Sequence, residues 1–277
     1  MDAIVSYFSE IPSTHRAAIL AGGIAVFWIW ESAAPAFRLE YRKWPHALVN
    51  FVFTATTIMV NFALAFVLLF AADWTQANRV GVLFLAPALS PWLQLLVGLL
   101  LLDLVSAWLA HWVQHKSPPL WRLHLVHHSD RQVDTTSANR HHPGESVVRF
   151  AFTVLAVFIA GTPMWMVFVY QALSVVLSQF NHANISLPPR LDRAIAWFIV
   201  SPDMHKVHHH FVLPYTDSNY GNIFSVWDRL FGTFRTLDRR ELVYGIDTHM
   251  EPERHSSVKA LMMMPFRPYT KTKPPGA

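Results

Sequence analysis

The chain of 277 residues is 53% hydrophobic and only 14% charged, with a formal net charge of +4. Soluble domains carry about 25% charged residues, so this composition is typical of a membrane protein. The absence of cysteine excludes disulfides, thiolate metal sites and cysteine-ligated iron–sulfur clusters. The basic residues form no stripe of the kind that binds nucleic acid, so we expect no nucleic-acid partner.

Apolar runs predict a membrane stem in the first half of the chain. Three runs, at about 17–36, 47–72 and 92–112, are long enough to cross about 30 Å of hydrocarbon. Two shorter runs, 146–160 and 163–181, are joined by Gly161-Thr162-Pro163, which predicts a helical hairpin with Gly161 as the C-cap. The residues leave open whether this hairpin crosses the bilayer fully. From residue 186 onward the chain is polar and soluble in character.

Histidines cluster where the apolar runs end. On a helix, residues i, i+3 and i+4 share one face, so histidines at these spacings point the same way. Three clusters show this spacing: His111 and His115; His124, His127 and His128; and His205, His208 and His209. His182 ends the hairpin. By contrast, His15, His46, His249 and His255 have no partner at such spacing, and we expect them to be ordinary surface or interfacial residues.

The distribution of lysine and arginine predicts the orientation in the membrane. If the 37–46 loop is cytoplasmic, every basic residue except Arg16 and Arg79 lies on the cytoplasmic side. The N-terminus is then outside, and all the histidine clusters meet at the cytoplasmic edge. We therefore predict an all-α integral-membrane helical bundle, three spans plus a helical hairpin. Its cytoplasmic helical cap would hold a histidine-rich di-metal site, and the membrane would be the bacterial inner membrane.

The number of histidines favours two metal ions. Imidazole binds iron, zinc, copper and nickel, but one zinc takes only four ligands. Nine imidazoles on two six-coordinate ions would leave about three positions open. No acid has the Glu-x-x-His spacing of soluble di-iron bundles, so two irons held by imidazole are the better interpretation. The alternative is a histidine-rich membrane metal transporter or metal-binding protein. Transporters place their ligands near the bilayer midplane, whereas the span centres here carry no histidine and Asp103 is their one acid.

Six elements between residues 95 and 236 occur in an order that resembles a known family. They are His111-x3-His115, then 119–129, 140–145, 181–184 and 202–209, and the closing signature at 219–221 with 227–234. Together they resemble bacterial-type members of the fatty acid hydroxylase and sterol desaturase superfamily of integral-membrane di-iron enzymes. One departure is Trp112, where the family often has arginine directly after the first histidine. This change concerns the edge of the site rather than the metal.

The resemblance implies a membrane di-iron oxygenase that hydroxylates or desaturates a lipid with O₂ and externally supplied electrons. It implies metal ligands at His111, His115, His124, His127, His128, His182, His205, His208 and His209. Whether His142 is a tenth ligand or supports one stays open, and His141 and His210 are not expected to bind. Asp203, Asp228, Asn181 and Asn184 are the preferred residues for orienting the ligands.

The resemblance also implies the cofactors, partners and division of the chain. The cofactors would be two iron ions, for which zinc can substitute in purified protein. The partners would be a bilayer lipid and an electron donor such as a ferredoxin, and the oligomeric state stays open. The chain would be one membrane-embedded catalytic domain, 1–277. It would comprise a stem at 17–112, a histidine-box region at 113–236 that includes the hairpin 146–181, and a cytoplasmic tail at 237–277.

Overall fold

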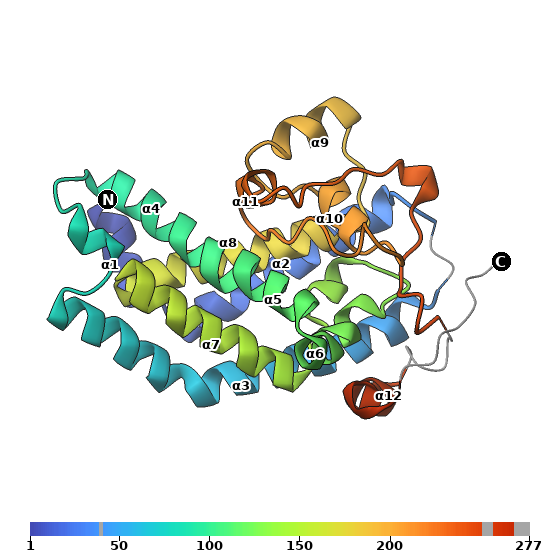
Figure 1. The fold of residues 1–277 in the computed structure, drawn as a ribbon, viewed down its shortest axis with the longest axis horizontal. Coiled ribbons are helices and arrows are strands. Elements are labelled where there is room, and N and C mark those ends of the chain that lie inside the picture. Colours follow the sequence, from blue (N-terminus) through green and yellow to red (C-terminus); the bar gives the residue numbers. More distant parts are fainter. Residues whose placement is uncertain (39–40, 251–256, 269–277) are drawn as a thin grey trace.

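The computed structural model describes residues 1–38, 41–250 and 257–268. These residues form helices and no β-strand, with three isolated β-bridges, so the all-α prediction is confirmed. Figure 1 shows the long helices running side by side along the long axis, with α1 (Asp2–Ser9) at one end and α6 (Pro118–His128) and the short helices from α9 (Pro189–Ile195) to α12 (Val258–Met263) gathered at the other. That end, the described residues of 117–142 and 183–268, is called the cap below.

Five long helical segments make the bundle. They are α2 (Ser13–Ala33), α3 (Lys43–Asn78), α7 (Pro143–Ala160), α8 (Met164–His182) and a continuous helix made of α4 (Pro91–Asp103), the π-helical η2 (Leu104–Leu109) and α5 (Ala110–Lys116). The short elements are α1 (Asp2–Ser9), η1 (Val82–Leu85), α6 (Pro118–His128), η3 (Thr135–Asn139), α9 (Pro189–Ile195), α10 (Pro202–His208), α11 (Val226–Leu230), η4 (Arg239–Glu241), α12 (Val258–Met263) and η6 (Met264–Phe266).

Local sequence explains where the key helices begin and end. Proline stands in the first turn of α4, α6, α7 and α10, where its missing N–H costs nothing. Gly161 ends α7 in the left-handed conformation, with φ of 70°, as the hairpin prediction required. The α7–α8 hairpin therefore returns the chain to the cap end and delivers His182 there.

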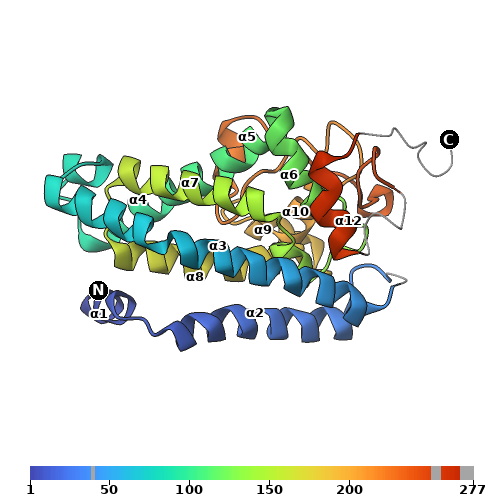
Figure 2. The same cartoon turned by 90° about the horizontal axis from the view of Figure 1, so that it is seen from below.

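The bundle core lies between α3, α4, α7 and α8. Its buried side chains include Leu68 of α3, Leu99 of α4, Val157 of α7 and Val167 of α8. Figure 2 shows α2 as an outer layer that runs along α8. Among the described residues, four helical segments are long and apolar enough to cross a membrane: Ser13–Ala33, Lys43–Leu85, Pro91–Lys116 and Pro143–Ala160. The first three correspond to the predicted spans, and the fourth is the first arm of the hairpin.

Part of the predicted tail packs into the fold. Leu261 of α12 and Met264 of η6 are buried against Leu125 and Val126 of α6 and Phe53 of α3. This hydrophobic contact fixes α6, which carries three of the clustered histidines. The predictions that concern 251–256, which include His255, and 269–277 lie outside the described residues.

Candidate metal centre

The four histidine-bearing segments meet where the bundle joins the cap. The end of the helix Pro91–Lys116 supplies His111 and His115, and α6 supplies three more. The last residue of α8 is His182, and α10 with the residue after it supplies the remaining three. A π-helical turn at Leu104–Leu109 directly precedes His111, and such turns are frequent at functional sites.

The nine predicted histidines fall into two groups whose nitrogens lie within 4.8 Å of one another. The five-histidine group is His111, His115, His124, His128 and His208. The four-histidine group is His127, His182, His205 and His209. The groups adjoin each other, because the rings of His128 and His209 are 4.9 Å apart and stacked.

In the five-histidine group, unprotonated nitrogens face each other. The Nδ1 of His111 donates to the Tyr220 carbonyl oxygen at 2.9 Å, and the Nδ1 of His124 donates to the Glu145 carboxylate at 2.8 Å. A neutral imidazole that donates through Nδ1 has a lone pair on Nε2. These two Nε2 atoms are 3.0 Å apart, an arrangement that is repulsive without a cation between the lone pairs.

The four-histidine group is arranged around His182. Its Nδ1 donates to the Ser178 carbonyl oxygen at 2.7 Å, which leaves a lone pair on Nε2. The Nε2 atoms of His205, His127 and His209 lie 3.0, 3.2 and 3.2 Å from it. One lone pair cannot accept three such contacts as hydrogen bonds, whereas a shared metal ion would satisfy all four rings.

These nitrogen–nitrogen distances suit a metal coordination shell. Imidazole nitrogens bind a first-row ion such as zinc at about 2.0–2.1 Å, so two ligands at right angles lie about 3.0 Å apart. The observed separations of 3.0–3.2 Å match this edge length. Each group is therefore able to hold a metal ion, and the donor set consists of imidazole nitrogen.

Burial keeps the cap histidines in the neutral form that binds metal. Desolvation, with repulsion from neighbouring imidazoles, lowers the pKa of His127, His128 and His205 well below its ordinary value. The same causes lower the pKa of His208 and His209. Because metal ions and protons compete for the same lone pair, these low pKa values favour metal binding at neutral pH.

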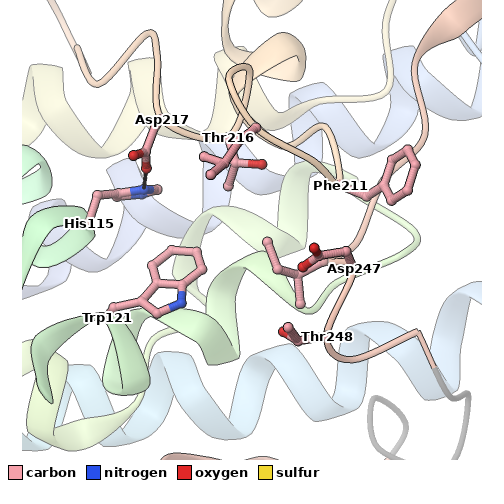
Figure 3. Close-up of a pocket in the computed structure, with 9 residues that line it drawn as sticks. His115, Trp121, Phe211, Thr216, Asp217, Asp247 and Thr248 are labelled. Carbon is pink, nitrogen blue, oxygen red and sulfur yellow. Dashed lines mark hydrogen bonds and ion pairs between the residues drawn. The ribbon is translucent and has the colours of Figure 1, made fainter. Parts of the chain in front are cut away.

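Carboxylates and carbonyls orient the rings from outside. Glu145, which is fully buried, accepts from His124, and its Oε1 also lies 2.9 Å from His141 Nδ1. Asp217 accepts from His115 Nδ1 at 3.1 Å (Figure 3). It is also paired with Lys116. Burial raises the pKa of Asp217, but these hydrogen bonds outweigh burial and hold the pKa below its ordinary value, so the carboxylate stays ionised. The Ser218 carbonyl oxygen accepts from His208 Nδ1.

The preferred orienting residues make other contacts in the structure. Asp203 pairs with Arg239 at 2.5 Å and with Lys206 at 3.7 Å. The Asn184 side chain accepts from the Phe37 N–H and donates to the Phe37 carbonyl oxygen. Asn181 donates to the Asn222 carbonyl oxygen. Asp228 is one step removed, since it fixes the Tyr220 backbone, whose carbonyl receives His111.

The orienting groups seen instead were only partly detectable from sequence. Glu145 follows His141 by four residues across the start of α7, a spacing that links the two side chains. Asp217 is 102 positions from His115, so only the fold brings them together. The carbonyls of Ser178, Ser218 and Tyr220 carry no sequence signal, because every residue has one.

The other histidines have different environments. His142 lies outside both groups; its Nδ1 accepts from the Gly144 N–H and its Nε2 donates to the Met262 carbonyl oxygen. His210 accepts from the Val243 N–H. The expectation of a surface or interfacial position holds for His15, which is exposed, and is wrong for His249, which is buried. His46 is half-buried, and its ring bridges two buried carboxylates, Asp130 and Asp134, a pairing that the sequence did not indicate.

Two buried aspartates bind the closing signature to the membrane helix. Asp103 accepts from the N–H groups of Ile223 and Phe224 and from Trp227 Nε1, at 3.1–3.2 Å. Asp228 accepts from Trp108 Nε1 in η2 and from the Tyr220 and Gly221 N–H groups. The intramembrane acid is therefore an anchor for the cap, which positions Tyr220 against His111.

A pocket of about 260 Å³ opens beside the five-histidine group. Figure 3 shows His115 and Asp217 on one side of it, with Trp121 of α6 below and Asp247 and Thr248 opposite. The Trp121 ring lies 4.8 Å from the His115 ring and 5.3 Å from the His128 ring. His115 therefore belongs to the five-histidine group and also lines a pocket that opens on the cap surface.

Fold and site together define an all-helical membrane protein with two histidine groups that are able to hold metal. The chain belongs to the fatty acid hydroxylase family, whose family model matches residues 95–233, just over half of the chain. All nine clustered histidines lie inside this matched region.

The chain is similar to several curated relatives. It is 26% identical over 147 residues to ornithine lipid hydroxylase OlsE of Rhizobium tropici, covering 53% of this chain and 43% of the relative. It is 28% identical to alkylglycerol monooxygenase of Homo sapiens, covering 50% of this chain and 30% of the relative. It is also 28% identical to cholesterol 25-hydroxylase of Mus musculus, covering 51% of this chain and 46% of the relative. The match thus spans less than half the length of these relatives. No solved structure matches the chain significantly.

Proposed function

We propose that the protein is a membrane di-iron oxygenase that hydroxylates a lipid with O₂ and externally supplied electrons. The observation that carries the proposal is the pair of adjoining groups of five and four histidines. Within these groups, Nε2 atoms of neighbouring rings lie 3.0–3.2 Å apart. Two iron ions held there would supply the activation of O₂ needed to attack an unreactive C–H bond. Zinc offers no redox chemistry and prefers four ligands, so five imidazoles that converge in one group favour a metal with a higher coordination number, such as iron.

The chain's own residues hold the ligands in place and exclude water. His111, His124 and His182 each donate Nδ1–H to a fixed acceptor, so their rings cannot rotate away from the centre. The rings of both groups are shielded from solvent, because the His115 side chain is 0% exposed and the other eight histidines are buried. A dry, preorganised centre protects a reactive oxidant from loss to water.

The relatives and the apolar helices support a lipid as the substrate. The matched relatives are named for hydroxylation or monooxygenation of ornithine lipid, alkylglycerol and cholesterol. Within the described residues, four helical segments could cross a bilayer, which would place the histidine centre beside membrane lipid. Because these relatives are hydroxylases and monooxygenases, we propose hydroxylation rather than desaturation.

The electrons would come from a separate carrier such as a ferredoxin. We propose that it docks on the cytoplasmic face, where the basic residues gather and where the histidine centre and cap would lie. The distribution of Lys and Arg supports this side for the centre, with the N-terminus outside. We propose the bacterial inner membrane as the location.

A metal transporter fits less well. Transport sites lie near the bilayer midplane and must release their ion. Here both groups lie at the ends of helices, and each offers four or five buried nitrogens to one ion. Such a site retains metal rather than passing it on.

The test is lipid-dependent oxygen consumption by the iron-loaded protein in vesicles of host lipid with a reduced ferredoxin. We expect oxygen consumption that requires the lipid, and a product lipid heavier by one oxygen atom. His111→Ala should abolish both, whereas His15→Ala, at an exposed position, should change neither. Metal transport into vesicles without lipid oxidation would refute the proposal, and a product lacking two hydrogens would refute hydroxylation.

A further inference from the structure

Large apolar side chains are exposed on one side of the cap, around α9 and α11. We call this the α9–α11 surface; its members are Leu191, Trp197, Phe198, Val226, Leu230 and Phe231. Phe198 is 75% exposed, Leu230 67% and Trp197 62%. Figure 1 places α9 and α11 together at one edge of the molecule. Contiguous exposed apolar surface of this kind marks a protein-binding or membrane-binding region.

The two segments that carry these side chains form one continuous surface. The Arg229 guanidinium lies 4.3 Å from the Trp197 ring centre and donates to the Ala196 carbonyl oxygen at 2.7 Å. The Ser225 N–H donates to the Phe198 carbonyl oxygen. The exposed rings after α9 are therefore fixed beside α11 rather than scattered over separate loops.

The attachment of this surface to the membrane helix sets its depth. Pro91–Asp103 contains 13 residues and so measures about 20 Å. Crossing about 30 Å of hydrocarbon takes about 20 residues, which carries the span past Asp103 to about residue 110. Trp227 of α11 donates to Asp103, and Phe231 stacks on Trp108 at 4.3 Å. Both attachment points lie within the segment that crosses hydrocarbon, the first about 10 Å inside its boundary.

The charges around the surface suit anionic lipid headgroups. Arg190, Arg193 and Arg235 are exposed. Between residues 186 and 236 the acids Asp192 and Asp228 are buried, and Asp203 and Asp217 are paired with basic side chains. A basic rim beside an apolar face is the pattern of a segment that lies in the membrane interface.

We propose that the α9–α11 surface is immersed in the leaflet on the side of the metal centre, with its apolar side chains among acyl chains and its arginines at anionic headgroups. The polar character of the chain after residue 186 predicts a wholly aqueous cap, whereas this proposal makes the cap partly embedded in the membrane. Three aromatic side chains in contact, Phe231, Trp108 and Tyr220, would separate the acyl chains from His111.

The cysteine-free sequence allows a direct test with single spin labels. Phe198→Cys and Leu230→Cys report on the surface in the full-length protein, reconstituted in vesicles that contain anionic phosphatidylglycerol. Phe62→Cys, 83% exposed in the middle of α3, is the lipid-facing reference. Leu213→Cys, 68% exposed beside the cap pocket, is the matched aqueous reference. The measured quantity is the ratio of collision rates with oxygen and with a water-soluble nickel complex.

We expect the labels at 198 and 230 to shift from the ratio of the Leu213 label toward that of the Phe62 label. Replacing Arg190 and Arg193 by Gln should move both labels toward water in anionic vesicles, with a smaller effect in neutral ones. Water-like ratios at either position would overturn the proposal. Spin–spin broadening that grows with the protein-to-lipid ratio would also overturn it, because it would show that a second copy covers the surface.

Discussion

Replacing Glu145 by Gln should weaken metal binding at the five-histidine group. Glu145 Oε1 accepts from His124 at 2.8 Å and lies 2.9 Å from His141, while Oε2 makes no hydrogen bond with the described residues. Glutamine would keep one acceptor, lose the charge that makes His124 more basic, and bury an amide N–H₂ without an acceptor. Loss of an orienting partner of this kind costs about 10–100-fold in metal affinity, or about 1.4–2.8 kcal/mol.

The assay is competitive titration of the metal-free protein with Zn²⁺ against a chromophoric chelator, which resolves the two binding steps. One step should weaken by this factor and the other should change little, because Glu145 contacts no ring of the four-histidine group at hydrogen-bond distance. Glu241→Gln, on an exposed turn of the cap, is the matched control and should bind like wild type. Unchanged affinity in Glu145→Gln, or equal weakening of both steps with a lowered melting temperature of the metal-free protein, would refute the reasoning.

Three further predictions follow from the geometry. His182→Ala should reduce metal occupancy to about one ion per chain, because it removes the nitrogen that the other three rings of the four-histidine group approach. The control His142→Ala should retain two ions. Elemental analysis distinguishes the outcomes, and two ions in His182→Ala would contradict the assignment. Asp103→Asn should destabilise the protein by about 1–3 kcal/mol, because an amide cannot accept from three donors as the carboxylate does; an unchanged melting temperature would contradict the anchor. A reporter after Ala277 should be cytoplasmic and one near Asp73 outside, and the opposite result at either position would reverse the proposed orientation.

The helices and the identity of the clustered histidines could be predicted because they depend on local spacing. The apolar runs predict the spans, and Gly161 predicts the turn between α7 and α8. The i, i+3 and i+4 spacing predicts which histidines share a helix face. Even His182, which has no neighbour at ligand spacing, could be placed, because a hairpin must return to the edge from which it started.

The sequence placed Glu145 and Asp217 near the histidine clusters, but which group orients which ring could not be predicted, because these pairings depend on long-range contacts. Asp217 and the Tyr220 carbonyl reach His115 and His111 across more than a hundred positions. Asp203 has the motif context of an orienting residue, yet it pairs with Arg239, which no local pattern indicated. The pairing of His46 with Asp130 and Asp134 has no local pattern either, because only the tertiary fold brings these residues together.

The most direct test of the central claim is the metal content and X-ray absorption spectrum of the protein loaded with ferrous iron without oxygen. The account predicts two ions per chain, with first shells of imidazole nitrogen completed by water. A single ion per chain, or carboxylate oxygen in the first shell of both ions, would contradict it.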